Sequence, residues 1–320
     1  MKKNIAIIAG EPFSINSEII AKSWRSINKN ERKNIFVIGN FRLIKKQLER
    51  KKIKIKTKEI NDIKDINSSN NLQIFNIHLN FKNPFKIKEK DNSKYVLKCL
   101  DTAHNFAKNK KILGFINAPI DKKIFKSKYP GVTEYLAKKN NLSDEEVMLL
   151  YNKELSVVPI TTHLDLREVS KKLKSNLIQK KIKTLNKFYI TRLNKKPKIA
   201  VLGLNPHNSE GKANSEEKRI IIPVVNKLKK KINIKGPFPA DTLFMKGKKS
   251  QFDVIVGMYH DQVLAPFKAL YNFNAINITL GLNYIRISPD HGTGKDIVYL
   301  NKANPMSLIQ SLKFFKLIKK

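Results

Sequence analysis

The sequence predicts an α/β protein built from two α/β/α lobes with mainly parallel sheets. One observation is length, because 320 residues are long for a single hydrophobic core. The other is pattern, because short apolar runs alternate with amphipathic segments of helix length. We place the first lobe at residues 1–128 together with 287–320, and the second at residues 129–286.

Eight apolar runs indicate strands, and the segments between them follow the same logic. In chain order the runs are residues 4–10, 34–40, 72–79, 112–119, 155–163, 198–207, 253–260 and 275–281. Residues 93–109 and 215–231 fit amphipathic helices. Residues 51–71 are rich in Lys, Ile and Asn and predict a variable surface region. Neither a P-loop nor a GxGxxG turn follows any strand, so an ordinary Rossmann dinucleotide turn is not supported.

The net charge of +38 suggests nucleic acid or an anionic surface when it is taken alone. However, 56 of the 64 basic residues are Lys and eight are Arg, the usual base-reading residue. The lysines are spread along the chain, with no aromatic–basic motif and no zinc-finger spacing. We therefore interpret the charge as a solvated surface and do not expect a nucleic acid partner.

Targeting signals are weak. No apolar run approaches the roughly 18 residues of a membrane span. The start "MKKNIAIIAGEP" resembles a signal peptide, but its apolar run is too short and fits a first strand better. Cys99 is the single cysteine, so no internal disulfide is possible, and we expect a cytoplasmic protein without membrane contact.

Three histidines stand where expected strands end. His163, His207 and His260 each follow such a run, and ligands of open α/β sheets bind beyond the carboxyl ends of strands. Three neutral imidazoles suit a divalent metal such as Zn²⁺ with positions open for substrate. Three unrelated loop histidines explain the pattern equally well at this point. Asp261 either orients His260 or caps a turn.

His78 and His104 lie in a strand-like and a helix-like pattern, and we expect both to be packing or surface residues. Anion-binding side chains follow the third histidine. Lys268 lies eight residues after His260, and Asn277 and Arg286 flank the run "NITLGLNYIR". A lysine suits phosphate, and an arginine suits a carboxylate bidentately.

Eight blocks occur in an order that resembles one family. They are "INAPIDK", "GVTEYLA", "TTHLDLREV", "GLNPHNSEGK", "GPFPADTLF", "MYHDQVLAPFK", "NITLGLNYIR" and "SPDHGTGKDI". Together they resemble the 4-hydroxythreonine-4-phosphate dehydrogenases of vitamin B6 biosynthesis, from about residue 10 to residue 296.

The resemblance implies an isocitrate/isopropylmalate-dehydrogenase-like fold and a homodimer with its site in a cleft at the dimer interface. It implies a divalent metal (Zn, Mg or Co) on His163, His207 and His260. Substrate contacts are implied for Thr133, Lys268, Asn277 and Arg286. The loop "DHGTGKD" resembles the adenosine-side cofactor loop of the wider fold, which assigns His291, Gly292 and Thr293 to NAD or NADP.

The implied reaction is NAD(P)-linked oxidation of the C3 hydroxyl of 4-phosphonooxy-threonine. The β-keto acid then loses CO₂ to give 3-amino-2-oxopropyl phosphate. Asp241, Lys268 and a metal-linked water remain candidates for the general base.

The chain departs from the family pattern at three places. Val132 replaces a histidine that contacts substrate in the family, which removes one polar contact. The first loop, usually "GDPxGIGPE", reads "GEPFSINSE", with Ser14, Asn16 and Ser17 in place of two glycines and a proline. Val263 replaces a glycine. A related enzyme acting on 4-phospho-erythronate or 4-phospho-threonate therefore stays open, as do a non-catalytic relative and a basic nucleic-acid-binding protein.

Overall fold

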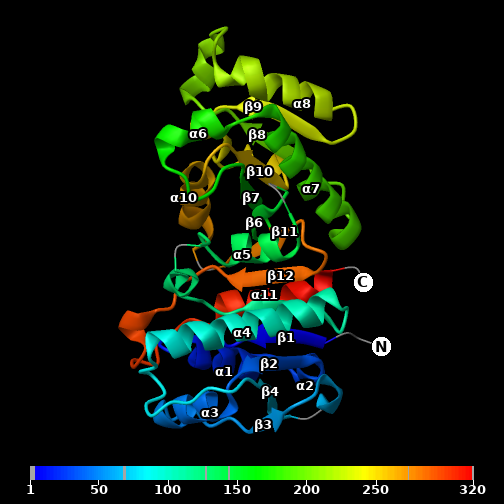
Figure 1. Ribbon diagram of the computed structural model, residues 1–320. Coiled ribbons are helices and arrows are strands. Elements are labelled where there is room, and N and C mark those ends of the chain that lie inside the picture. Colours follow the sequence, from blue (N-terminus) through cyan, green and yellow to red (C-terminus); the bar gives the residue numbers. More distant parts are fainter. Residues whose placement is uncertain (1–3, 68–69, 127, 143–144, 273, 319–320) are drawn as a thin grey trace. The chain divides into compact units, whose positions relative to one another are not determined.

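Figure 1 shows the fold, a computed structural model that describes residues 4–67, 70–126, 128–142, 145–272 and 274–318. The chain groups into two compact units. Unit 1 comprises Met1–Leu136 and Asn283–Phe315, and unit 2 comprises Ala137–Leu282 and Lys316–Lys320. These bounds differ by a few residues from the lobes expected above, which stay a prediction.

The sheet of unit 1 is parallel throughout, in the order β3-β4-β2-β1-β5-β12. Every residue of β2 is buried, as expected of a parallel strand covered on both faces. Helix α4 packs across β5, β1 and β2 (Figure 1). The strands are β1 (Asn4–Ile8), β2 (Ile35–Gly39), β3 (Thr57–Ile60), β4 (Leu72–Asn76), β5 (Ile112–Asn117) and β12 (Ile285–Pro289).

The helices of unit 1 lie between consecutive strands of this sheet, except α11, which follows the last strand, β12. They are α1 (Asn16–Ser26), α2 (Lys29–Arg32), α3 (Phe41–Arg50), α4 (Glu89–Lys108), α5 (Val132–Lys139) and α11 (Met306–Leu317). The last residues of α5 and of α11 fall in unit 2. Helices α2 and α3 begin at asparagine caps, Asn28 and Asn40, whose side chains accept backbone N–H groups.

The sheet of unit 2 is mixed, in the order β11-β6-β7-β10-β8-β9. Strand β6 is antiparallel to both β11 and β7, whereas β7, β10, β8 and β9 are parallel neighbours. The strands are β6 (Val147–Tyr151), β7 (Ser156–Pro159), β8 (Ile199–Leu202), β9 (Ile234–Phe238), β10 (Val254–Gly257) and β11 (Ile276–Leu280). The α/β class with mainly parallel strands is confirmed.

The helices of unit 2 are α6 (Leu166–Lys172), α7 (Ser175–Leu193), α8 (Ile222–Leu228), α9 (Ala240–Leu243) and α10 (His260–Tyr271). Helix α10 packs against β7 and β10. Its buried face, Val263, Leu264 and Phe267, joins the hydrophobic core with residues from β7, β8 and β10. Among the described residues, no helix is both long enough and apolar enough to cross a membrane.

All eight expected strands are present, each two to six residues shorter than the apolar run. The run "NITLGLNYIR" forms parts of two strands, because β11 ends at Leu280 and β12 begins at Ile285. Gly281 makes the break with φ 92°, and a Cβ there would stand 2.9 Å from the Glu145 carbonyl oxygen. Four strands, β3, β6, β9 and β12, were not predicted as separate elements.

Candidate active site

The three histidines follow three neighbouring parallel strands of unit 2. Strand β10 pairs with β7 on one side and with β8 on the other. His163 lies shortly after β7, His260 shortly after β10 and His207 shortly after β8. The carboxyl ends of parallel strands meet at one edge of a sheet. The chain therefore brings the three histidine positions to the same edge of the sheet.

His163 and His260 lie close together. Their ring centroids are 5.9 Å apart. Thr161 ties the two loops, because its N–H donates to the Met258 carbonyl at 3.1 Å and its hydroxyl donates to the same oxygen at 2.7 Å. His260 opens helix α10 rather than lying in a loop. The strand-end pattern thus places two of the predicted ligands side by side.

Asp261 contacts the third histidine directly. Its Oδ1 lies 2.6 Å from His260 Nδ1. Because Asp261 engages Nδ1, Nε2 is the ring nitrogen that would bind a metal. The contact is the one that a supporting carboxylate would make. That it orients a metal ligand stays a prediction.

His207 lies in a tightly wound turn after β8. Four successive residues, His207 to Glu210, have φ between 47° and 55°, in the left-handed region. Side chains with a Cβ adopt this conformation at a cost, so surrounding contacts must hold the turn.

Glu217 holds this turn in place. Its side chain is buried, with 1% exposed, and its carboxylate accepts the N–H groups of Leu204 and Asn205, each at 2.8 Å. It also accepts the Ser209 hydroxyl at 2.9 Å. Burial alone would raise the pKa of Glu217, but these donors lower it below its usual value. Sequence reasoning did not single out Glu217, although it lies ten residues after the "NPH" block.

The three imidazoles are donors of the kind that Zn²⁺ and Co²⁺ accept, but the structure does not gather all three into one group. Within the described ranges, no group of three or more His, Cys, Asp or Glu side chains stands ready to hold a metal ion. The structure joins His163 with His260 but does not add His207 to the pair. Imidazole nitrogen is nevertheless a donor that Zn²⁺ and Co²⁺ accept readily.

Arg286 and Thr133 form a second polar group, in unit 1. Arg286 lies on β12 with 3% exposed; its Nε donates to Asn117 Oδ1 at 2.6 Å and one terminal nitrogen donates to Thr133 Oγ1 at 3.2 Å. Burial lowers the pKa of Arg286 to about 10, so the guanidinium stays charged at neutral pH. Asn117 ends β5 and is the second residue of the "INAPIDK" block, which is the signal that would have found it.

The other substrate and acid–base candidates lie in unit 2. Asn277 stands on β11, and its buried Oδ1 has no hydrogen-bond partner in the described part of the chain. Such an acceptor suits a ligand donor. Lys268 lies more than two turns into α10 and Asp241 lies on the short helix α9, and both are exposed.

The expected cofactor loop lies in unit 1. His291 Nδ1 is 2.9 Å from the Gly292 carbonyl oxygen, and its buried Nε2 has no hydrogen-bond partner within the described ranges. Burial lowers the pKa of His291, so the ring is neutral at pH 7. The Thr293 carbonyl accepts the Ile15 N–H at 3.0 Å, which joins this loop to the first loop.

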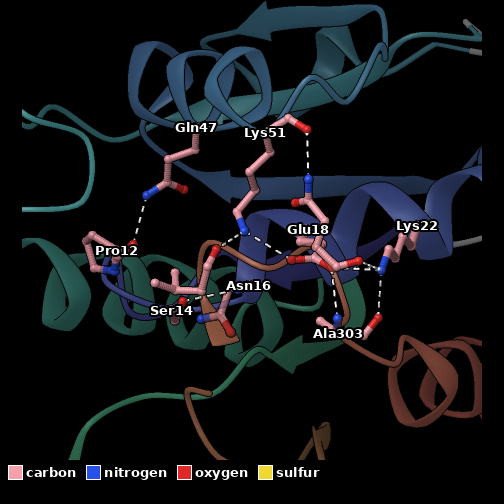
Figure 2. A network of polar contacts seen from close by, with 10 residues as sticks. Pro12, Ser14, Asn16, Glu18, Lys22, Gln47, Lys51 and Ala303 are labelled. Atoms are coloured by element: carbon pink, nitrogen blue, oxygen red, sulfur yellow. Dashed lines mark hydrogen bonds and ion pairs between the residues drawn. The ribbon is translucent and has the colours of Figure 1, made fainter. Parts of the chain in front are cut away.

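The altered first loop is held by the residues that replace the family's glycines, and Figure 2 shows Ser14 hydrogen-bonded to Asn16 and Gln47 hydrogen-bonded to Pro12. The Ser14 hydroxyl donates to the Glu11 carbonyl, and Asn16 Nδ2 donates to the Pro119 carbonyl at 2.8 Å. Gln47 reaches the same loop from α3, donating to the Pro12 carbonyl at 2.8 Å. The loop is thus fixed by side chains.

Val263 has a packing role. It is fully buried in the core of unit 2, and a Cβ on Gly257 would stand 2.5 Å from its Cγ1. The residue fills space between α10 and β10, which the sequence did not reveal. His104 also packs, because its Nδ1 lies 2.8 Å from the Tyr284 hydroxyl. His78 is exposed and follows β4 instead of lying within it.

Fold and side chains define an α/β enzyme class in which polar groups gather at the carboxyl ends of strands. Comparison with known proteins then gives the family. The model of the pyridoxal phosphate biosynthetic protein PdxA matches residues 31–315. The chain belongs to this family.

Relatives match two thirds or more of the chain. The chain is 37% identical to the 4-hydroxythreonine-4-phosphate dehydrogenase of Sulfurihydrogenibium sp. (strain YO3AOP1), covering 99% of this chain and 98% of the relative. It is also 37% identical to the D-threonate 4-phosphate dehydrogenase of Pectobacterium atrosepticum, covering 67% of each. A crystal structure of the 4-hydroxythreonine-4-phosphate dehydrogenase of Klebsiella pneumoniae superposes with a TM-score of 0.86 at 30% identity, covering 99% of both chains.

Proposed function

We propose that this chain is a metal-dependent, NAD(P)-linked dehydrogenase of 4-hydroxythreonine 4-phosphate that serves pyridoxal phosphate synthesis. The carrying observation is the His163–His260 pair at adjoining strand ends, in a chain similar over 99% of its length to a dehydrogenase of that name. The alcohol at C3 is oxidised: the hydride of its C–H bond passes to the nicotinamide, the hydroxyl proton passes to the general base, and the resulting β-keto acid loses CO₂.

His163, His207 and His260 would hold the divalent metal, one of Zn²⁺, Mg²⁺ or Co²⁺, with Asp261 fixing the His260 ring. A metal bound there supplies Lewis acidity toward substrate oxygens. The chain's own residues orient the imidazoles. Thr161 joins the loops of His163 and His260, and Glu217 holds the turn that carries His207.

Substrate and cofactor fall to the remaining groups. We assign the anionic ends of the substrate to Thr133, Lys268, Asn277 and Arg286, because a fixed charge orients the hydroxyl carbon toward the nicotinamide. Lys268 or Asp241 serves as general base. His291, Gly292 and Thr293 bind NAD or NADP. We further propose a cytoplasmic homodimer, as the resemblance implies.

Val132 favours a second candidate. A valine cannot make the polar substrate contact of the family histidine, and a relative covering 67% of this chain is named for D-threonate 4-phosphate. That substrate, like a 4-phospho-erythronate, lacks the amino group. A related activity on such a phosphorylated hydroxy acid is therefore the alternative.

One assay tests both candidates. The purified protein receives NAD⁺ or NADP⁺ with 4-phosphonooxy-threonine, 4-phospho-threonate or 4-phospho-erythronate, with and without a chelator. We expect turnover that falls at least about 100-fold on chelation or on His207→Ala. His78→Ala, which changes an exposed histidine in unit 1, should retain turnover. Turnover unaffected by the chelator would reject the metal mechanism.

A further inference from the structure

A cavity of about 570 Å³ in unit 1 is lined by Glu11 of the first loop and by Lys295 and Tyr299, which follow the expected cofactor loop. Because it joins these two loops, this cavity is counted with the cofactor site proposed above. A second cavity of unit 1, of about 440 Å³, has no place in the proposed reaction.

The second cavity is lined by residues of helix α3, of strand β3 and of the segment between them, where α3 contacts β3 (Figure 1). Part of its lining is apolar, because Leu48 is buried and Ile53 and Ile55 are half-buried. A volume of about 440 Å³ falls in the range of small-molecule sites, which is about 300–1,000 Å³. The cavity therefore has the size and the apolar surface of a small-ligand site.

Lysines supply most of the charged lining. Lys45, Lys52 and Lys54 are exposed, and no contact of their ammonium groups with an acceptor occurs among the described residues. Glu49 adds one carboxylate, so the lining carries a net charge of +2. Three ammonium groups around one cavity repel one another, and a bound anion removes this repulsion. The charge of the lining thus selects an anionic ligand.

The segment that carries two of these lysines is held by hydrogen bonds. The N–H groups of Lys52 and Ile53 each donate back to a carbonyl of α3 at 2.9 Å, and Lys52 has φ 54°, in the left-handed region. Free carbonyls at the end of a helix repel anions, and these two carbonyls are engaged. Farther along, Arg25 of α1 donates to the Lys54 carbonyl at 2.7 Å. The backbone of this wall is therefore fixed before any ligand binds.

We propose that this cavity binds a small phosphate monoester with an apolar body. The phosphate contacts Lys45, Lys52 and Lys54, and the apolar body packs on Ile53 and Ile55. A phosphate monoester carries a charge of about −1.5 to −2 at neutral pH, which matches the net charge of the lining, whereas a carboxylate brings a single charge. Lysine binds phosphate as a point charge. This ligand site is separate from the proposed reaction and stands without it.

Methyl NMR of the full chain tests the proposal, with phenyl phosphate as the probe. Ile53 and Ile55 line the cavity, so their methyl signals report binding here; Ile53→Val and Ile55→Val assign the signals. We expect phenyl phosphate to shift both signals with a dissociation constant at least about 10-fold lower than that of inorganic phosphate or phenol, because each of these offers only one half of the contact.

Two triple variants separate this site from the general charge of the chain. In the first, each of the three lining lysines is replaced, as Lys45→Gln, Lys52→Gln and Lys54→Gln. It should bind phenyl phosphate at least about 10-fold more weakly than wild type, because charge-assisted hydrogen bonds to the phosphate are lost.

The matched control removes the same charge from exposed lysines outside the cavity, as Lys56→Gln, Lys58→Gln and Lys64→Gln. It should bind phenyl phosphate as wild type does. All six side chains are exposed, so both variants should fold. Equal weakening in the two variants would reduce the binding to general attraction by a basic surface and overturn the site. Phenyl phosphate that leaves both isoleucine signals unshifted, or that binds no tighter than inorganic phosphate, would overturn it too.

Discussion

Val132 is the residue whose replacement bears most directly on substrate choice. It begins α5 and precedes Thr133, whose hydroxyl contacts the charged Arg286. Val132→His restores a polar group beside this pair. If 4-hydroxythreonine 4-phosphate is the native substrate, we expect kcat/KM for it to rise about 10-fold, the worth of one hydrogen bond.

The control for this change is Val132→Ala, which alters size without adding polarity. It should leave the preference among phosphorylated substrates unchanged. If Val132→His lowers turnover of 4-hydroxythreonine 4-phosphate and leaves that of a 4-phospho-threonate intact, the second candidate is favoured.

Glu18 is the central residue of a buried polar network (Figure 2). Its side chain is fully buried and pairs with Lys51 at 3.0 Å, itself 3% exposed, and with Lys22 at 2.7 Å. It also accepts the Ala303 N–H at 2.9 Å. Breaking a buried pair leaves a charge uncompensated, so Glu18→Gln should lower the free energy of unfolding by about 3 kcal/mol. Urea denaturation measures the change.

A matched control exists on the surface. Glu168 pairs with Lys171 at the same 3.0 Å, but both side chains are exposed. Glu168→Gln should change the free energy of unfolding by less than about 0.5 kcal/mol. If both variants lost the same free energy of unfolding, burial would not be what makes the Glu18 ion pairs important.

The Glu18 pair also has a defined pH dependence. Burial raises its pKa, but the two lysines and the backbone donor outweigh burial and lower it below 4.5. A carboxyl with a lowered pKa stabilises the fold above its unfolded pKa, and this stability is lost as pH falls through the folded pKa. The difference between wild type and Glu18→Gln should therefore be largest above pH 5 and shrink in acid.

At the scale of residues, the sequence indicated candidate site residues better than it indicated the side chains that contact them. The histidines and Arg286 could be singled out as candidates because strand ends and motif blocks are local patterns. Asn117, Gln47 and Glu217 were missed because their roles depend on contacts across the fold, such as Gln47 with Pro12. Nothing in a Glu-Glu step tells which carboxylate turns inward.

At the scale of elements, we expect the left-handed turn after β8 to depend on Glu217, and a substitution tests this. Three donors of the turn end on this carboxylate. Glu217→Ala should loosen the turn and weaken Co²⁺ binding about 10-fold or more, as loss of a ligand's supporting partner does. Titration of the visible Co²⁺ spectrum measures this without relying on turnover.

The neighbouring carboxylate provides the control. Glu216 contacts only the side chain of Asn205, at 2.9 Å, among the hydrogen bonds described for it. Glu216→Gln should bind Co²⁺ within about 2-fold of wild type, well under the effect of losing a supporting partner. Unchanged Co²⁺ binding in Glu217→Ala would show that the turn is held without this carboxylate, or that His207 is no ligand.

The elements that were predicted are those with continuous apolar runs. Strand β9 was missed because its sequence, IKGPF, contains the Gly-Pro step that normally marks a turn. Strand β3 lies in the lysine-rich stretch, and two of its four residues are exposed. An edge strand of this kind leaves little periodic signal.

At the scale of the whole molecule, the net charge of +38 predicts contact with polyanions without sequence preference. Fluorescence anisotropy with duplex DNA should show weak binding at 50 mM salt that falls at least about 100-fold by 200 mM. Different DNA sequences should compete equally. Binding that is tight and sequence-selective at 200 mM salt would instead support a nucleic-acid function.

The discontinuity of unit 1 has a consequence for biosynthesis. Strand β12, which pairs with β5, and the cavity residues Lys295 and Tyr299 leave the ribosome only after all of Ala137–Leu282. Domains generally fold as units during synthesis. Unit 2 can thus fold before β12, the last strand of the unit 1 sheet, has been synthesised. The cavity beside Glu11 therefore forms only after Ala137–Leu282 of unit 2 has been synthesised.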